Sequence, residues 1–129
     1  MSSATTVRSP LPEIDYRFLE EKGWQYEVVV GPGEVRVYMR GFELPAVYAP
    51  RLTDLLIRLP MGYPQANPDM FWTKPDVLLA RGGYPNRADY HDPTADGWQR
   101  WSRHGGWRAG VDNLRTKLAA VKHELEAGS

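Results

Sequence analysis

The C-terminal part of the chain carries the pattern that most restricts its fold. Apolar residues recur there at helical spacing: Val111, Leu114, Leu118, Val121 and Leu125. Charged residues point the other way on the same helix: Asp112, Arg115, Lys122 and Glu124. A helix with one apolar stripe needs an apolar surface to cover it, and a sheet is the usual partner. We therefore predict a C-terminal helix over about 111–125 that packs on a sheet.

A second, shorter helix is expected near the N-terminus. Ile14, Phe18 and Leu19 have helical spacing, and Gly23 is a typical residue for ending such a helix. The polar residues 1–9 that precede it are expected to be flexible. At 129 residues the chain is long enough for one core and too short for two, so we expect a single domain over 10–129.

The middle of the chain predicts an antiparallel sheet. Residues 24–30 and 34–40 flank a Gly-Pro-Gly turn, and apolar residues alternate with polar ones in the second of these segments, as in a hairpin. Two further strands, 55–59 and 70–72, follow proline-rich breaks. The expected fold is α+β, with an N-terminal helix, a four-stranded antiparallel meander and a C-terminal helix on one face.

Composition excludes several classes of function. The 16 basic residues equal the 16 acidic ones, so no global charge attracts nucleic acid or an anionic membrane. No apolar run approaches the roughly 20 residues of a membrane span, and the N-terminus lacks a signal-peptide pattern, so a cytoplasmic protein is expected. The chain has no cysteine, which excludes disulfides, thiolate metal sites and thiol nucleophiles.

One segment carries a family resemblance. Residues 59–73, LPMGYPQANPDMFWT, resemble the ubiquitin-conjugating (UBC-like) signature, in which a strand ends in Leu-Pro and Tyr-Pro, a second proline and alternating apolar residues follow. Pro68 falls on the second proline of that signature. Met70 and Trp72 fall on its two inward-facing apolar positions, which suits a half-buried strand.

A second segment supports the same resemblance. Trp107, followed by a short turn and the amphipathic helix, resembles the tryptophan, turn and crossover helix of the family, with Ala109-Gly110 in place of Ser-Pro. Within the superfamily the chain resembles the prokaryotic ubiquitin-conjugating family E. The resemblance implies a UBC-like fold without the extra C-terminal helices of eukaryotic members. It also implies a bacterial pathway with a ubiquitin-like protein, an activating enzyme and a JAB-type peptidase.

The resemblance places the catalytic residues in doubt. The family cysteine lies eight residues before the tryptophan that matches Trp107, and Gln99 occupies that position here. The family asparagine that stabilises the oxyanion has its best counterpart in Asn86, within Tyr84-Pro85-Asn86. Ser102 lies close to the expected place of the cysteine, and the resemblance suggests it as the acceptor of an oxyester.

A serine acceptor needs a base, because a free alcohol is a poor nucleophile. His104 is the nearest candidate. In an extended segment residues two apart point to the same side, so Ser102 and His104 could meet. The alternative is that Ser102 bonds a loop backbone while His104 is a solvated neighbour of arginines.

Two other groups of polar and aromatic residues are better explained by structural roles than by metal or nucleic-acid binding. His91 between Asp89 and Asp92 lacks the separated second histidine of usual zinc sites, so no metal or cofactor is expected, and His91 is kept as a second-choice base. The tryptophans and arginines of 98–108 could stack bases, but nearby aspartates argue against nucleic acid. We expect Trp107 and Met70 in the core and Arg103 exposed, or holding an acidic partner segment.

Three functional hypotheses stay open. The first is a conjugating enzyme that accepts a ubiquitin-like protein on Ser102 as an oxyester, with His104 or His91 as base and Asn86 at the oxyanion. The second is a catalytically inactive scaffold of the same fold that binds the ubiquitin-like protein or the activating enzyme. The third is a cysteine-to-serine variant of a natural cysteine enzyme. A serine hydrolase is disfavoured, because no Gly-x-Ser-x-Gly motif occurs.

Overall fold

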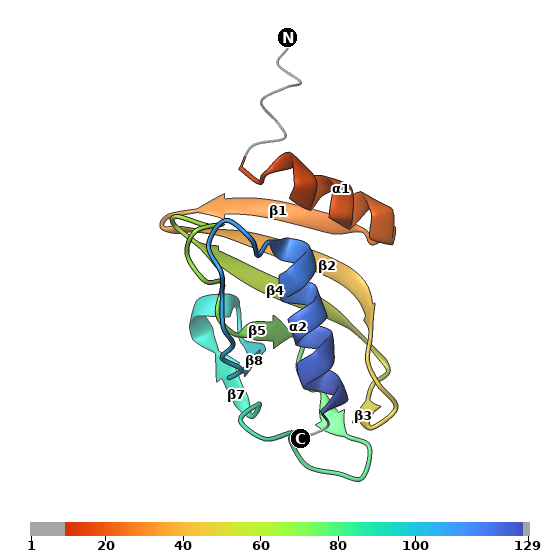
Figure 1. Ribbon diagram of the computed structural model, residues 1–129. Helices are drawn as coiled ribbons and strands as arrows, with labels where there is room; N and C mark the ends of the chain where they lie inside the picture. The colour runs from red at the N-terminus through yellow and green to blue at the C-terminus, as the bar shows by residue number, and fades with distance from the viewer. Residues whose placement is uncertain (1–9, 128–129) are drawn as a thin grey trace.

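The computed structural model describes residues 10–127, in which two helices and a central sheet are arranged as Figure 1 shows. Segment 1–9, expected to be flexible, lies outside the described residues. Helix α1 (Glu13–Lys22) ends at Gly23, whose φ of 74° is left-handed and whose N–H donates to the Glu20 carbonyl. The predicted N-terminal helix and its end are therefore confirmed.

A six-stranded antiparallel sheet forms the centre of the molecule. Its spatial order is β1 (Tyr26–Gly31), β2 (Glu34–Glu43), β4 (Leu52–Pro60), β5 (Phe71–Thr73), β8 (Trp98–Trp101) and β7 (Tyr90–Asp92). The four expected strands correspond to β1, β2, β4 and β5, so the expected count was too low. The meander also stops at β5, because β8 rather than β7 pairs with it.

The two additional strands of the large sheet lie between β5 and α2 in the chain. Strand β7 has three residues and β8 has four, too few to show a clear alternation. A short 3-10 helix, Pro93–Ala95, joins them. Two-residue strands β3 (Tyr48–Ala49) and β6 (Leu78–Leu79) pair separately as a second small sheet.

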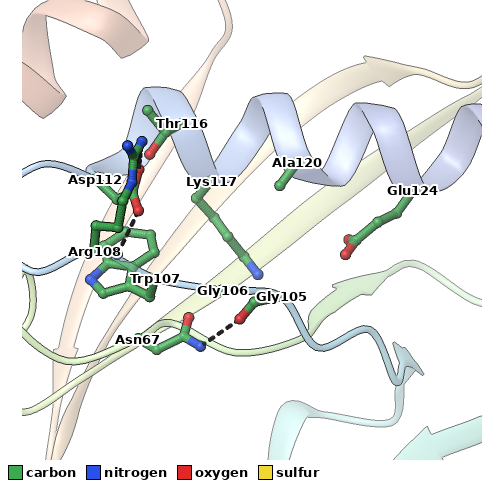
Figure 2. Close-up of a pocket in the computed structure, with 10 residues that line it drawn as sticks. All are labelled: Asn67, Gly105, Gly106, Trp107, Arg108, Asp112, Thr116, Lys117, Ala120 and Glu124. Carbon is green, nitrogen blue, oxygen red and sulfur yellow. Dashed lines mark hydrogen bonds and ion pairs between the residues drawn. The ribbon is translucent and has the colours of Figure 1, made fainter.

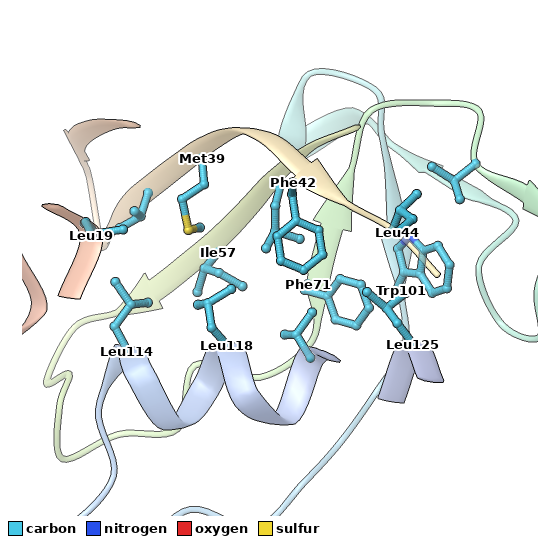
Figure 3. Packing of buried hydrophobic residues seen from close by; sticks show 14 of the residues in the cluster. Leu19, Met39, Phe42, Leu44, Ile57, Phe71, Trp101, Leu114, Leu118 and Leu125 are labelled. Atoms are coloured by element: carbon cyan, nitrogen blue, oxygen red, sulfur yellow. The ribbon is translucent and has the colours of Figure 1, made fainter. Parts of the chain in front are cut away.

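Helix α2 (Leu114–Glu126) lies across one face of the large sheet (Figure 1). Four residues of the predicted stripe are buried in the main core: Leu114, Leu118, Val121 and Leu125. Figure 3 shows Leu114 and Leu118 pointing from the helix toward residues of the sheet, among them Ile57 and Phe71. The expectation of a C-terminal helix packed on the sheet is confirmed.

The start of α2 was placed too early. Val111 is 58% exposed and precedes the helix. Asn113 caps the N-terminus: its side chain accepts from the Thr116 N–H at 3.2 Å, and Thr116 Oγ1 accepts from the Asn113 N–H at 2.9 Å. This capping box satisfies the N–H groups of Asn113 and Thr116, so the helix begins at Leu114.

The opposite face of the sheet carries a smaller core of Leu56, Trp72, Ala95 and Trp98. Phe71, next to Trp72, belongs to the main core under α2. Met70 is only half-buried and packs against the smaller core, with a left-handed φ of 63°. The expectation of a core Met70 was therefore wrong, because the backbone bends just before β5 and Phe71 takes the place facing the helix.

A buried carboxylate joins the two helices to the loop after β4. Asp15 Oδ2 accepts from the Tyr63 hydroxyl at 2.6 Å, and Oδ1 accepts from the Leu114 N–H at 3.2 Å. Burial raises the pKa of Asp15, although both hydrogen bonds act against that rise. The Asp15 contacts fix the N-terminus of α2 beside the loop that carries the family signature.

Candidate functional site

Ser102 directly follows β8 and is half-buried. Its N–H donates to the Arg87 carbonyl at 3.1 Å. The Arg103 N–H donates to the Trp101 carbonyl at 2.9 Å, which closes a three-residue turn around Ser102. The chain is therefore not extended at Ser102, and the geometric premise for pairing it with His104 does not hold.

Arg103 draws the Asn86 segment toward Ser102. Its Nη1 donates to the Asn86 carbonyl at 2.8 Å and to the Ser102 carbonyl at 3.3 Å. Its guanidinium also lies over the Trp101 ring, 5.5 Å from the centroid. Arg103 is half-buried rather than exposed as expected, because it has these internal partners. Asn86 and Ser102 thus lie close through their backbones, while the Asn86 side chain is exposed.

His104 is paired with a carboxylate rather than with Ser102. Its Nδ1 lies 2.6 Å from Asp69 Oδ2, and its side chain is 60% exposed. Within the described residues the Ser102 hydroxyl makes no hydrogen bond, to His104 or to any other group. The serine and histidine are neighbours in sequence, but the described structure does not form a nucleophile and base pair from them.

The second-choice base, His91, lies on β7 in a separate polar group. Its Nε2 is 2.7 Å from Asp76 Oδ1, which also accepts from the Tyr84 hydroxyl at 2.9 Å. The hydrogen bonds from His91 and then Tyr84 lower the pKa of Asp76. This arrangement engages His91 with Asp76 and not with Ser102.

Gln99, at the position that the resemblance assigns to the cysteine, is completely buried. Its Oε1 accepts from the Val77 N–H at 2.7 Å. Its Nε2 donates to the Val77 carbonyl at 2.9 Å and to the Ala88 carbonyl at 2.6 Å. Strand β8 thereby ties two flanking loops together through one amide, and no surface is left there for a reactive group.

The three tryptophans of this region differ in how deeply they are buried. Trp98 and Trp101 are buried, and Trp101 stacks on Phe71 with ring centroids 5.2 Å apart, so neither is exposed for stacking on a base. Trp107 is only half-buried, and its Nε1 donates to the Pro64 carbonyl at 2.9 Å. The expectation of a core Trp107 was wrong, because it packs on the outer loop beside Tyr63.

A cleft of about 500 Å³ opens between α2 and the segment 105–108. In Figure 2, Lys117 extends from the helix toward Gly105 and Gly106, with Glu124 further along the same side. Lys117 is 8% exposed, and burial lowers the pKa of its ammonium, partly offset by attraction to Glu124 and Asp69. Lys117 was missed in the sequence, although it stands three residues after Leu114 and four before Val121, on the apolar side of the helix.

Across residues 10–127, no cluster of three or more histidine, aspartate or glutamate residues is arranged to hold a metal ion. In the same range, neither helix is long and apolar enough to cross a membrane.

Comparison with family models gives one match, to prokaryotic E2 family E, over residues 11–128. The chain belongs to prokaryotic E2 family E. No curated protein and no solved structure gives a significant match. Family membership agrees with the helix, antiparallel sheet and C-terminal helix described above, and it makes this chain an E2-like protein of a conjugation pathway. The chain has no cysteine, so no thiol is present to form a thioester.

Proposed function

We propose that this E2-like protein acts in a bacterial ubiquitin-like pathway as a binding protein that does not carry the ubiquitin-like protein as an ester or thioester. It would bind the ubiquitin-like protein or the activating enzyme through the surface of its E2-like fold. The observation that carries the proposal is Gln99. At the position suggested for the nucleophile, an amide fills the space and satisfies three main-chain groups, which suits a structural role.

The surroundings of Ser102, the other candidate nucleophile, support the same proposal. An alcohol gains reactivity when a base removes its proton, and that base has to lie within hydrogen-bond reach. The Ser102 hydroxyl has no such partner among the described residues, and His104 pairs with Asp69. The arrangement favours a scaffold over an oxyester carrier.

The oxyester function is kept as a second candidate because of one specific contact. Asp69 engages His104 through Nδ1, which leaves Nε2 as the nitrogen able to accept a proton, as in triads where a carboxylate orients a histidine. Opening of the turn around Ser102 would be needed to bring the two side chains together. Asn86, held nearby through Arg103, would then be the candidate oxyanion contact.

The deciding experiment mixes the protein with a ubiquitin-like protein and activating enzyme of the same organism, with and without ATP. Binding measured by calorimetry, with no covalent adduct on a denaturing gel, is expected. An ATP-dependent adduct at Ser102 that hydroxylamine cleaves and thiols do not would instead establish the oxyester. Absence of both binding and adduct would overturn both candidates.

Two variants sharpen the result. Ser102→Ala should bind as well as the parent, because the proposed function does not use the hydroxyl. Ser102→Cys tests the idea of a replaced natural cysteine, since a thioester sensitive to thiols would form if the surrounding site were complete. The JAB-type peptidase stays a prediction that follows from the resemblance, and the cytoplasmic location stays a prediction that follows from the apolar pattern and the N-terminal residues.

A further inference from the structure

The cleft between α2 and segment 105–108 contains the amine of a largely buried lysine. Lys117 is 8% exposed, and among the described residues no hydrogen bond or ion pair within 4 Å involves its Nζ. Figure 2 shows the ammonium directed away from the helix into the space beside Gly105 and Gly106. Burial of the side chain favours the neutral amine more here than at the surface, although the nearby carboxylates of Glu124 and Asp69 oppose this effect.

The charged groups around the cleft are mostly occupied with one another. Arg108 pairs with Asp112, whose Oδ2 also accepts from the Arg108 N–H. Asp69 pairs with His104. Glu124 is the exception, because its Oε1 is buried and has no hydrogen-bond partner within the described part of the chain. The cleft thus offers one unpaired amine and one unpaired carboxylate oxygen.

We propose that this cleft is an acyl-acceptor site, in which Lys117 Nζ takes the acyl group of a small thioester as a stable amide. The neutral amine attacks the thioester carbonyl carbon, forming a C–N bond as the C–S bond breaks. The nitrogen proton passes to the departing thiolate, which leaves as the thiol. No oxidant, reductant or further reactant is needed.

The physical basis is the same one that activates lysines in enzyme pockets. An amine in a poorly solvated site is neutral at a lower pH than one at the surface, and the neutral form is the nucleophile. Burial lowers the pKa of Lys117, while Glu124 and Asp69 pull in the opposite direction. This site lies on α2 rather than beside Ser102, and it is independent of the proposed binding function.

Acylation of the native protein by a small probe tests the proposal. The probe is the thioester of N-acetylglycine with N-acetylcysteamine, and peptide mass spectrometry follows all lysines in the chain: Lys22, Lys74, Lys117 and Lys122. At pH 7.5 Lys117 should be acylated severalfold faster than Lys122, since the neutral fraction of an amine rises as its pKa falls. An equal or slower rate at Lys117 would overturn the proposal.

Lys122 is a matched reference because it lies on the same helix and is exposed. The advantage of Lys117 should shrink as the pH approaches about 10.5, where exposed lysines also become neutral. Lys117→Arg should remove the fast product and leave acylation of Lys122 unchanged. If Lys117→Arg does not fold, Lys117→Met serves for the same comparison.

A second pair of variants tests whether the reaction takes place in the cleft. Ala120 lines the cleft, whereas the adjacent Ala119 lies on another side of α2. Ala120→Phe should slow acylation of Lys117 severalfold by filling the space, and Ala119→Phe should leave it unchanged. Equal rates in both variants would mean that Lys117 reacts only after local unfolding, and the proposal would fail.

Discussion

Gln99 and Lys117 are both long polar side chains in the interior, yet their surroundings differ. Gln99 is fully buried and its amide makes three hydrogen bonds to the main chain. Lys117 is nearly as buried and has none within the described residues. A buried polar group stabilises a fold only when it is paired. Gln99, at the position that the resemblance assigns to the cysteine, is therefore a structural link, while Lys117 on α2 is the candidate for chemistry.

The largest effect is expected from removing the Gln99 amide, which tests whether Gln99 stabilises the fold. Gln99→Ala should lower the free energy of unfolding by about 3–5 kcal/mol, because it leaves buried groups of Val77 and Ala88 unpaired and creates a cavity. Urea denaturation measures the change. Gln65→Ala is the matched control, since Gln65 is exposed, and it should stay within about 0.5 kcal/mol of the parent. A loss below about 1 kcal/mol for Gln99→Ala would contradict its linking role.

The second largest effect is expected from truncating a core residue of α2. It tests whether α2 packs on the sheet, and Lys117 is buried only if it does. Leu118 follows Lys117 but points into the main core. Leu118→Ala should cost about 2–5 kcal/mol as a buried truncation. Val111→Ala, at the exposed residue before the helix, should be nearly neutral in the same denaturation experiment. Similar values for the two variants would show that the stripe does not pack on the sheet.

A third test compares the accessibility of residue 99 with that of residue 102. Because the chain has no cysteine, Gln99→Cys and Ser102→Cys each contain a single thiol. The thiol at residue 102 should react with a disulfide reagent at least about 100-fold faster than the thiol at 99, which reacts only when the structure opens. Both should react equally in denaturant. Equal native rates would mean that position 99 is accessible and that its structural assignment is wrong.

The main elements of the fold could be predicted from sequence because they have strong periodicity. The stripe of α2, Gly23 after α1 and the Gly-Pro-Gly hairpin each depend on local residues. Strands β7 and β8 could not be predicted, because they are short and are defined by pairing with β5 and each other. The start of α2 could also have been predicted from neighbouring residues, since Asn113 and Thr116 form a capping box.

The candidate site was harder to predict than the fold. Whether Ser102 meets His104 depends on a turn closed by the Arg103 N–H and on Asp69, which is distant in sequence. The burial of Gln99 depends on loops around Val77 and Ala88 that carry no periodic signal. Lys117 had a visible signal, its place on the apolar side of the helix, but spacing alone could not reveal a cleft there.

The smallest expected effect concerns the cost of the unpaired amine. Burial lowers the pKa of Lys117 from the 10.5 of an ordinary lysine, so the ammonium destabilises the folded state. Lys117→Met should therefore raise the free energy of unfolding by about 1 kcal/mol near pH 7. Between the folded-state pKa and 10.5 the unfolded chain binds more protons, so the stability of the parent rises with pH. The advantage of Lys117→Met should accordingly shrink as the pH approaches 10.5. Urea midpoints from pH 7 to 10.5 measure this change, with Lys122→Met as the exposed control. An advantage that stays constant over this range would show that Lys117 keeps an ordinary pKa, and the contrast with Gln99 would then be one of hydrogen bonding alone.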